Sequence, residues 1–485
     1  MVYELWHKNK NVLSVEYEPV TNRFGKVLEI YDEKHIPVGI QNIPNYNLSQ
    51  GLQFWWQSRL IPKNRSNFKI NNPDIDFLLT GSNGFNLSDQ YWIKEEKSDM
   101  TWEKGNFYTN PFNEDIGEYI TGQGHYNLQN MTSRSPDLFS NGQQDKRWVI
   151  EKGTRFLVKY GRPPYYEQPF NEMLASEICR RLDIPYVQYT LLIKGKTEPV
   201  IYSMCPCFVN PDTEFVPAGF IQYGREKKRQ VSNYNHLIEC CSQYNIQKKE
   251  NIEKTFMQMI VLDYIIANTD RHYGNFGFLR NAETLEWIGN APNFDTGNAM
   301  FYEYPTSDLR KSTAIMENVI SRSFVAKQKE QAEKFSDNIA MLDVDFKKLD
   351  GIKDYYEDLL SRNPKEDAER IHLLSGLLEK RIRDFQEIVY SKNSVSKSFI
   401  QIISNDNSNL RVMDKINIAR KVIYQNNKND GLLVDKYLKS IKTKTLEEFE
   451  LKIQTEINKS VKKQQKKNLR NNKSISDDDG MSISD

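Results

Sequence analysis

The stretch Asn268-Thr-Asp-Arg-His-Tyr-Gly-Asn275 decides which fold this sequence predicts. Directly before it, residues 252–267 carry apolar side chains at helical spacing, and the run is too short to cross a bilayer, so it predicts a buried helix. The stretch itself places Asp270 five residues before Asn275. The chain therefore leaves a core helix and enters a polar loop that carries a carboxylate and an amide.

A hairpin and a second acidic loop follow this first loop. Residues 276–279 and 285–288 have strand composition and predict two paired strands. They lead to Asn293-Phe-Asp-Thr-Gly297, in which Asp295 stands two residues before a glycine. A core helix, an acidic loop, a hairpin and an Asp-x-Gly loop therefore follow one another without interruption.

The region upstream supplies a lysine and an acidic helix. Residues 148–159 predict a hairpin whose second strand ends at Lys159. After a loop with three prolines, residues 171–182 predict a helix that carries Glu172 and Glu177. A strand lysine therefore precedes a helix with two carboxylates that are candidates to pair with it.

Phosphoryl transfer requires these parts, because the reaction depends mainly on positioning and on neutralising charge. A carboxylate such as Asp270 can orient an attacking hydroxyl and accept its proton. Asn275 and Asp295 offer the hard oxygen ligands that Mg²⁺ prefers, and Lys159 can neutralise phosphate charge. Each residue alone is explained more simply as part of a turn or a strand. The joint order of the four favours a kinase-like site.

The loop resembles the catalytic loop of HipA-like kinases, which share its Asp-Arg-His-x-x-Asn form with the phosphatidylinositol-kinase class. Further segments resemble one HipA-like subgroup: Ser135-Pro-Asp-Leu-Phe-Ser-Asn-Gly142 with Lys146-Arg-Trp148, Pro169-Phe-Asn-Glu-Met-Leu-Ala-Ser176, and Leu182-Asp-Ile-Pro185. The resemblance covers roughly residues 130 to 390. It implies an α+β, two-lobed protein-kinase-like fold with a β-rich N-terminal lobe and a helical C-terminal lobe.

The resemblance implies catalytic and metal-binding roles for the matching residues. Asp270 would be the catalytic base, and His272 would support the loop by hydrogen bonding rather than act as a nucleophile. Asn275 and Asp295 would be the ligands of Mg²⁺.

The nucleotide would be ATP. Lys159 would contact its phosphates and pair with Glu172, with Glu177 more than one turn later as the competing partner. A second hairpin around residues 194–196 would feed a hinge at Ser203 to Cys207 that receives adenine. The expected hinge residues are Ser203, Met204 and Cys205.

A loop at residues 135–146 would cover the phosphates. It contains one glycine, Gly142, so a glycine-rich cradle is not evident. HipA-like kinases can phosphorylate a serine in this loop and thereby switch themselves off. The candidates are Ser135 and Ser140, of which Ser135 is preferred, and a plain connecting turn explains the loop about as well.

Composition limits the remaining classes of function. The net charge of +1 provides no global field to attract nucleic acid or membrane, so neither is expected as a direct partner. The N-terminus shows no signal-like apolar run, and no segment reaches the roughly 18 to 20 apolar residues of a membrane span. The five cysteines fit neither a disulfide framework nor a zinc site. We therefore expect a cytoplasmic protein, in which the Lys459 to Lys473 run is a solvated tail rather than a binding patch for nucleic acid or lipid.

We expect five parts: a β-rich N-terminal region (1–130), a kinase small lobe (131–207), a large lobe (208–395), a helical appendage (396–458) and a disordered charged tail (459–485). Asn363-Pro-Lys-Glu366 and Thr445-Leu-Glu-Glu448 have the pattern of capping boxes that start helices. The purpose of residues 42–130 does not follow from the sequence pattern.

The sequence therefore predicts an ATP- and Mg²⁺-dependent serine/threonine kinase with a protein substrate. One alternative is a kinase for a lipid or small molecule, which the same loop permits. Another is an inactive kinase-fold scaffold, which would not need the full set of ionic residues. The resemblance further implies autophosphorylation and, because HipA-like proteins can be toxins, a small DNA-binding antitoxin as a candidate partner.

Overall fold

The computed structural model describes residues 1–43, 47–62, 81–122, 132–195, 197–342, 344–405 and 412–426. The expectations for Thr445 to Glu448, for Lys459 to Lys473 and for the tail at 459–485 lie outside these residues. The chain divides into two compact units, residues 1–331 with 345–381, and residues 332–344 with 382–485. Every candidate site residue lies in the first unit. No helix in the described ranges is long and apolar enough to cross a membrane.

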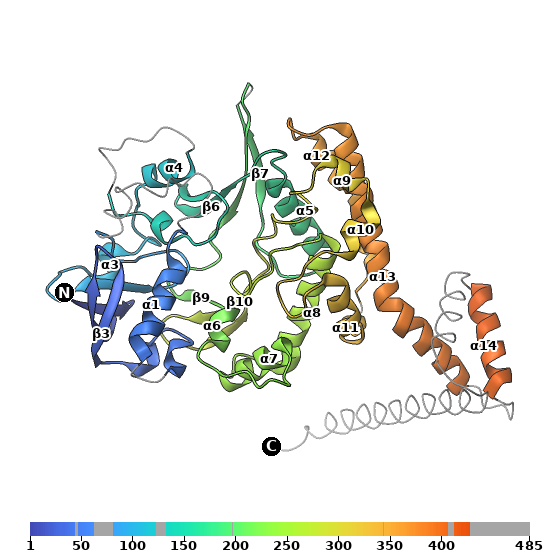
Figure 1. Ribbon diagram of the computed structural model, residues 1–485, viewed down its shortest axis with the longest axis horizontal. Coiled ribbons are helices and arrows are strands. Elements are labelled where there is room, and N and C mark those ends of the chain that lie inside the picture. The colour runs from blue at the N-terminus through green and yellow to red at the C-terminus, as the bar shows by residue number, and fades with distance from the viewer. Residues whose placement is uncertain are drawn as a thin grey trace, which may run out of the picture. The chain divides into compact units, whose positions relative to one another are not determined.

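Antiparallel sheets build the β part of the first unit (Figure 1). Their strand orders are β3-β2-β1-β4, β5-β6-β8-β7 and β11-β10-β9. The strands are β1 (Val2–His7), β2 (Lys10–Glu18), β3 (Arg23–Ile30), β4 (Tyr91–Glu95), β5 (Lys146–Glu151), β6 (Thr154–Tyr160), β7 (Thr190–Lys194), β8 (Val200–Pro206), β9 (Thr213–Pro217), β10 (Gly277–Asn281) and β11 (Trp287–Asn290). Most neighbours are joined by hairpins, which is typical of an α+β protein. The expected α+β class is confirmed.

Helices dominate after β9. The α-helices are α1 (Leu48–Arg59), α3 (Trp102–Gly105), α4 (Asp115–Thr121), α5 (Gln168–Arg181), α6 (Ala218–Gln222), α7 (Asn233–Gln243), α8 (Lys249–Ile265), α9 (Thr306–Leu309), α10 (Ser312–Glu317), α11 (Gln328–Ala340), α12 (Ile352–Ser361), α13 (Ala368–Asn405) and α14 (Val412–Asn426). Short 3₁₀ helices are η1 (Glu33–His35), η2 (Ile40–Asn42), η5 (Pro136–Phe139) and η6 (Phe346–Leu349). The helices predicted at 171–182 and 252–267 correspond to α5 and α8, each shifted by about one turn or less.

The second sheet places Lys159 in an inner strand. Strands β5 and β6 form the predicted hairpin, and Lys152 and Gly153 at its turn have φ values of +49° and +82°. Two successive positive φ values are the geometry of a tight hairpin turn, and glycine takes the second without strain. In the register of the sheet, Lys159 pairs with Lys146 on one side and with Ser203 on the other.

The third sheet connects the two acidic loops. The predicted hairpin is observed as β10 and β11, and β9 adds to its other edge. Gly277 lies opposite Pro217, and a Cβ atom at this position would come within 2.2 Å of the carbonyl oxygen of Val216. Because only glycine permits this approach, Gly277 fixes the start of β10 two residues after Asn275.

The capping box predicted at Asn363 to Glu366 is wrong. Helix α13 begins at Ala368, and the Asp367 carboxylate accepts the Arg370 N–H at 2.8 Å as its cap. The Asn363 side chain instead closes a turn with the Lys365 N–H at 3.0 Å. The Glu366 carboxylate, which should have completed the box, faces the Arg370 guanidinium at 3.4 Å, so an ion pair replaces the reciprocal cap.

The N-terminal region contains more helix than the sequence predicted. Its sheet packs against α1, and the shared core includes Leu13, Leu52, Trp56, Ile116 and Phe139. These residues come from β2, α1, α4 and η5, so residues on both sides of the expected boundary at 130 share one apolar cluster. The proposed boundary between 1–130 and 131–207 therefore crosses a common core.

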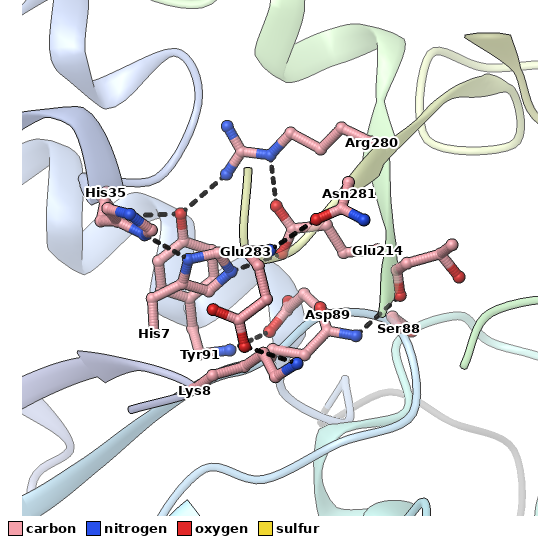
Figure 2. A network of polar contacts seen from close by, with 12 residues as sticks. His7, Lys8, His35, Ser88, Asp89, Tyr91, Glu214, Arg280, Asn281 and Glu283 are labelled. Atoms are coloured by element: carbon pink, nitrogen blue, oxygen red, sulfur yellow. Dashed lines mark hydrogen bonds and ion pairs between the residues drawn. The ribbon is translucent and has the colours of Figure 1, made fainter. Parts of the chain in front are cut away.

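A buried polar network fixes this region to the third sheet (Figure 2). His7 lies 2.8 Å from His35 through the two Nδ1 atoms and 2.9 Å from the Glu214 carboxylate through Nε2. Arg280 binds the same carboxylate and donates to the Tyr91 hydroxyl at 2.9 Å. Burial opposes ionisation of Glu214, but Arg280 and His7 outweigh it and lower its pKa to about 2. The histidines, to which the sequence assigned no role, therefore join β1 to the hairpin that follows the first acidic loop.

We expect stability to fall on mild acidification because of His35. Burial and the neighbouring His7 lower its pKa below the ordinary 6.5, against a weaker opposite effect of Asp32. The unfolded chain therefore binds this proton more readily, so the stabilisation is present above the ordinary pKa and is lost as pH falls below it. Urea unfolding at about pH 7.5 and about pH 5.5 should show this loss, and His35→Gln should reduce it. The exposed His372 provides the matched control His372→Gln, and an equal pH slope in all three proteins would contradict the assignment.

Candidate active site

One cavity of about 1000 Å³ brings most of the candidate residues together. Its lining includes residues from the second and third sheets, from both acidic loops and from α1. The candidates that line it are Lys159, Cys205, Asp270, His272, Asn275, Asp295 and Ser140. Glu172, Ser203, Met204 and Ser135 do not belong to its lining.

Lys159 is the centre of a buried ionic cluster. Its Nζ lies 2.8 Å from Glu172 Oε1 and 2.5 Å from Asp295 Oδ1. Burial alone would lower the pKa of Lys159, but Asp295 and Glu172 raise it well above its usual value. Glu177, the competing partner, binds Arg180 and Arg181 instead. The lysine is thus held as a cation between the acidic helix α5 and the second acidic loop.

The same Glu172 carboxylate also holds the second acidic loop. Its Oε2 accepts the Thr296 N–H at 3.0 Å and the Thr296 hydroxyl at 2.5 Å. Asp295 adopts a left-handed φ of +57°, and its N–H donates to the Tyr189 hydroxyl at 3.2 Å. A non-glycine residue in this region is strained, so these flanking contacts hold the carboxylate in place.

The charge state of Asp295 follows from its neighbours. Burial opposes ionisation, but Lys159 and then Lys146 hold the pKa of Asp295 well below its usual range. The carboxylate is therefore ionised at neutral pH. Lys146 also lines the cavity, although the sequence assigned it no role. The feature that could have indicated this role is its position at the start of β5, where it pairs with Lys159 of β6.

A buried ion pair supports the first acidic loop. The Arg271 guanidinium makes bonds of 2.9 to 3.1 Å to Asp263 at the end of α8, and donates to the carbonyl oxygens of Asn275 and Phe294. Both members of the pair are buried. One arginine thus connects the core helix to both acidic loops.

Asp270 faces the cavity with both carboxylate oxygens in contact. Oδ2 accepts from the Asn298 amide at 2.9 Å, and Oδ1 lies 2.9 Å from Nη1 of Arg322. His272 uses Nδ1 to accept the Gly274 N–H at 3.0 Å. The imidazole therefore makes its contact within the loop, as a supporting residue would.

Asn275 and Asp295 suit a hard divalent cation. The Asn275 amide nitrogen donates to the carbonyl oxygen of Asp270 at 2.9 Å, which leaves its Oδ1 as the atom to offer a metal. In the described residues, no group of three or more His, Cys, Asp or Glu side chains could hold a metal ion. A pair of protein oxygens completed by phosphate oxygens and water is the donor set that Mg²⁺ favours at nucleotide sites. The residues therefore fit Mg²⁺.

Of the three expected hinge residues, Cys205 lines the cavity, and Ser203 and Met204 do not. Ser203 is fully buried and pairs with Lys159 in the ladder, and Met204 packs with an apolar cluster around Val158. Cys205 lines the cavity, and the wall continues through residues 206–209. Strand alternation explains the position of Met204, because it must point to the opposite face from Cys205. Burial raises the pKa of the Cys205 thiol to about 12, which fits a packing residue.

The two candidate serines differ in position. Ser135 is buried and caps η5, where its hydroxyl donates to the Asp137 carboxylate at 3.1 Å. That carboxylate also accepts the Trp148 N–H at 2.8 Å, which fixes the loop to β5. Ser140 lines the cavity. The geometry therefore favours Ser140, in contrast to the preference for Ser135 from the sequence.

Comparison with known proteins shows similarity to one family and to one kinase in particular. Residues 215–354 match the family described as the HipA-like C-terminal domain. The serine/threonine-protein kinase CtkA of Helicobacter pylori is 27% identical over 245 residues, which are 48% of this chain and 73% of CtkA. These two matches confirm the resemblance to HipA-like kinases.

Two solved structures are similar as well. The crystal structure of the Helicobacter pylori proinflammatory kinase CtkA gives a TM-score of 0.41 with 18% identity, over 51% of this chain and 93% of that chain. HipA of Shewanella oneidensis MR-1, in a complex with HipB and operator DNA, gives a TM-score of 0.46 with 12% identity, over 79% of this chain and 97% of that chain.

Proposed function

Because residues 215–354 match the HipA-like C-terminal domain, we propose that this chain uses ATP and Mg²⁺ to phosphorylate serine or threonine hydroxyls of proteins. The class of enzyme, a serine/threonine kinase, agrees with the similarity to CtkA. The observation that carries the proposal is the cavity that Lys159, Asp270, Asn275 and Asp295 line together. It supports transfer chemistry because cation, base and metal-ligand positions meet in one space.

The proposed roles follow from the contacts. Asn275 and Asp295 would hold Mg²⁺, which when bound neutralises phosphate charge. Lys159 would exchange its contact with Asp295 for a contact with the phosphates of ATP. The Glu172 carboxylate would keep the Lys159 ammonium group in place. Asp270 would orient the acceptor hydroxyl and take its proton. The adenine would lie against residues 205–209 at the cavity wall.

The proposal is tested by incubation of the purified protein with γ-labelled ATP and Mg²⁺, followed by mass spectrometry. We expect label on the wild-type protein, located at Ser140, which lines the cavity, rather than at Ser135, and none on Lys159→Met. Ser135→Ala and Ser140→Ala separate the two sites. Absence of both label and Mg²⁺-dependent ATP binding would instead favour an inactive scaffold.

The same assay separates a protein kinase from a kinase for lipids or small molecules. Label transferred to lipid or metabolite fractions, and not to protein, would indicate the second kind of enzyme. A small DNA-binding antitoxin belongs to the proposal as a candidate partner, and co-purification with the product of a neighbouring gene tests it. Failure to find that partner would leave the kinase activity itself unaffected.

A further inference from the structure

We infer that Arg322 is a further catalytic residue, a cation that contacts the phosphoryl group during transfer while it holds Asp270. The inference rests on the proposed function. Arg322 lines the cavity, and its Nη1 lies 2.9 Å from Asp270 Oδ1. Its side chain is 54% exposed, so the ion pair itself adds little to stability. Because the ion pair contributes so little to stability, the Arg322 side chain can be explained better by a role in catalysis.

The segment that carries Arg322 is built onto the catalytic loop. The Gln331 side chain accepts hydrogen bonds from the Phe324 and Val325 N–H groups, both at 3.1 Å, and from the hydroxyls of Ser321 and Ser323. These bonds lie on both sides of Arg322. They fix the backbone from which the guanidinium extends.

Two further contacts join this segment to the loop. The Phe324 ring is buried and lies 6.0 Å from the ring of Phe276 and 6.3 Å from that of Tyr273. The Gln328 amide donates to the carbonyl oxygen of Asn268 at 2.6 Å. Arg322 is therefore positioned by the same loop that carries Asp270, as a preorganised charge requires.

The other cationic side chains near the site have partners other than Asp270. Arg271, next to Asp270 in sequence, is buried and occupied by Asp263, so it does not reach the cavity. Lys159 forms ion pairs with Glu172 and Asp295. Arg59 and Arg280 line the cavity and are engaged in ion pairs with Asp89 and Glu214. Lys146 and Arg162 also line it, but Lys146 acts on Asp295, and Arg162 donates to the carbonyl oxygen of Gln143. The ion-pair partner of Arg322 is Asp270 itself, at the place where the acceptor hydroxyl must lie.

The step balances with these residues. The acceptor oxygen forms a bond to the γ-phosphorus as the bond between that phosphorus and the β–γ bridging oxygen breaks. ADP leaves with the electron pair, and the hydroxyl proton passes to Asp270. Negative charge on the transferring group is spread over its equatorial oxygens, where a guanidinium is most effective. Each oxygen of Asp270 has a second lone pair, so the base can keep its contact with Arg322 while it accepts the proton.

Arg322→Ala tests the inference. We expect kcat for phosphoryl transfer to fall roughly 10²- to 10³-fold, with the KM for ATP changed by less than about threefold. Arg322→Lys should recover part of the rate, and added guanidinium should rescue Arg322→Ala. The second readout is calorimetric binding of ADP and Mg²⁺ with aluminium fluoride, a mimic of the transferring group. The fluoride should tighten ADP binding in the wild type and not in Arg322→Ala, while binding of ADP alone stays the same.

Arg310→Ala is the control, because Arg310 is an equally exposed arginine that pairs with Glu369 outside the cavity. A higher rate in Arg322→Ala would overturn the inference and make the ion pair an inhibitory latch. An unchanged rate would overturn it too and make the pair a surface contact. Both results require wild-type transfer, so they leave the proposed function standing. A wild type that neither binds ADP nor transfers phosphate would refute the proposed function and, with it, this role.

Discussion

Asp270→Asn should reduce phosphoryl transfer by about 10²- to 10⁴-fold and leave nucleotide binding close to that of the wild type. The amide oxygen can still accept from Arg322 or from Asn298, so the loop keeps one of these two contacts. It cannot accept the hydroxyl proton in the transition state. The loss should therefore appear in kcat rather than in the KM for ATP, and steady-state kinetics with calorimetric ATP binding measures both.

Glu303→Gln provides the comparison for this variant. Glu303 is another carboxylate that lines the cavity, and it accepts from the Tyr302 hydroxyl at 2.6 Å. The same change from carboxylate to amide should leave turnover near the wild-type rate. Retained turnover in Asp270→Asn would remove Asp270 from the role of base. A variant that fails to fold would show instead that the carboxylate is structural.

Asp263→Asn should lower the free energy of unfolding by about 3 to 5 kcal/mol, because it leaves the buried Arg271 guanidinium without its counter-charge. A typical domain has a stability of about 5 to 15 kcal/mol, so this single amide substitution should be visible in expression level as well. Urea unfolding of the purified variant gives the energy, and the change should be accompanied by loss of transfer activity.

Two further variants make this expectation specific. Glu369 makes a bidentate pair with Arg310 of similar length, but in an exposed position, so Glu369→Gln should not change the unfolding midpoint measurably. Replacing both members of the buried pair, Asp263→Leu with Arg271→Met, should recover part of the stability, because no unpaired charge remains. It should not recover activity, since Arg271 also donates to Asn275 and Phe294. Equal loss in the single and double variants would show that packing, and not charge, is the cause.

Local patterns predicted the elements that carry the site. The β5–β6 hairpin, helix α8 and the β10–β11 hairpin could be predicted because turn residues and apolar spacing act over a few neighbouring positions. The sequence already preferred Glu172 over Glu177 as the partner of Lys159, and the ion pair in the structure agrees, because only Glu172 faces the sheet while Glu177 binds Arg180 and Arg181.

Long-range contacts account for what local patterns could not predict. Arg322 meets Asp270 across 52 positions through a segment held by side-chain hydrogen bonds, which leave no period in the sequence. Likewise, Glu214 on β9 pairs with His7 on β1 and with Arg280 on β10, which lie far apart in the chain. Nor does the sequence say which face of β8 meets the cavity, where Cys205 lies and Met204 does not.

The contacts of both carboxylate oxygens of Glu172 have a thermodynamic consequence for the proposed enzyme. One oxygen of this carboxylate holds Lys159 and the other holds Thr296, while Lys159 and Asp295 also neutralise each other. A metal ion bound by the Asp295 carboxylate would free Lys159 to contact phosphate. In the same way, a phosphate bound by Lys159 would free the Asp295 carboxylate to bind the metal ion. Each ligand thus removes the cost of the other's entry, and by linkage the gain in affinity is equal in both directions. In the proposed enzyme, metal and nucleotide would then bind synergistically, so the site would be mostly either empty or occupied by both ligands.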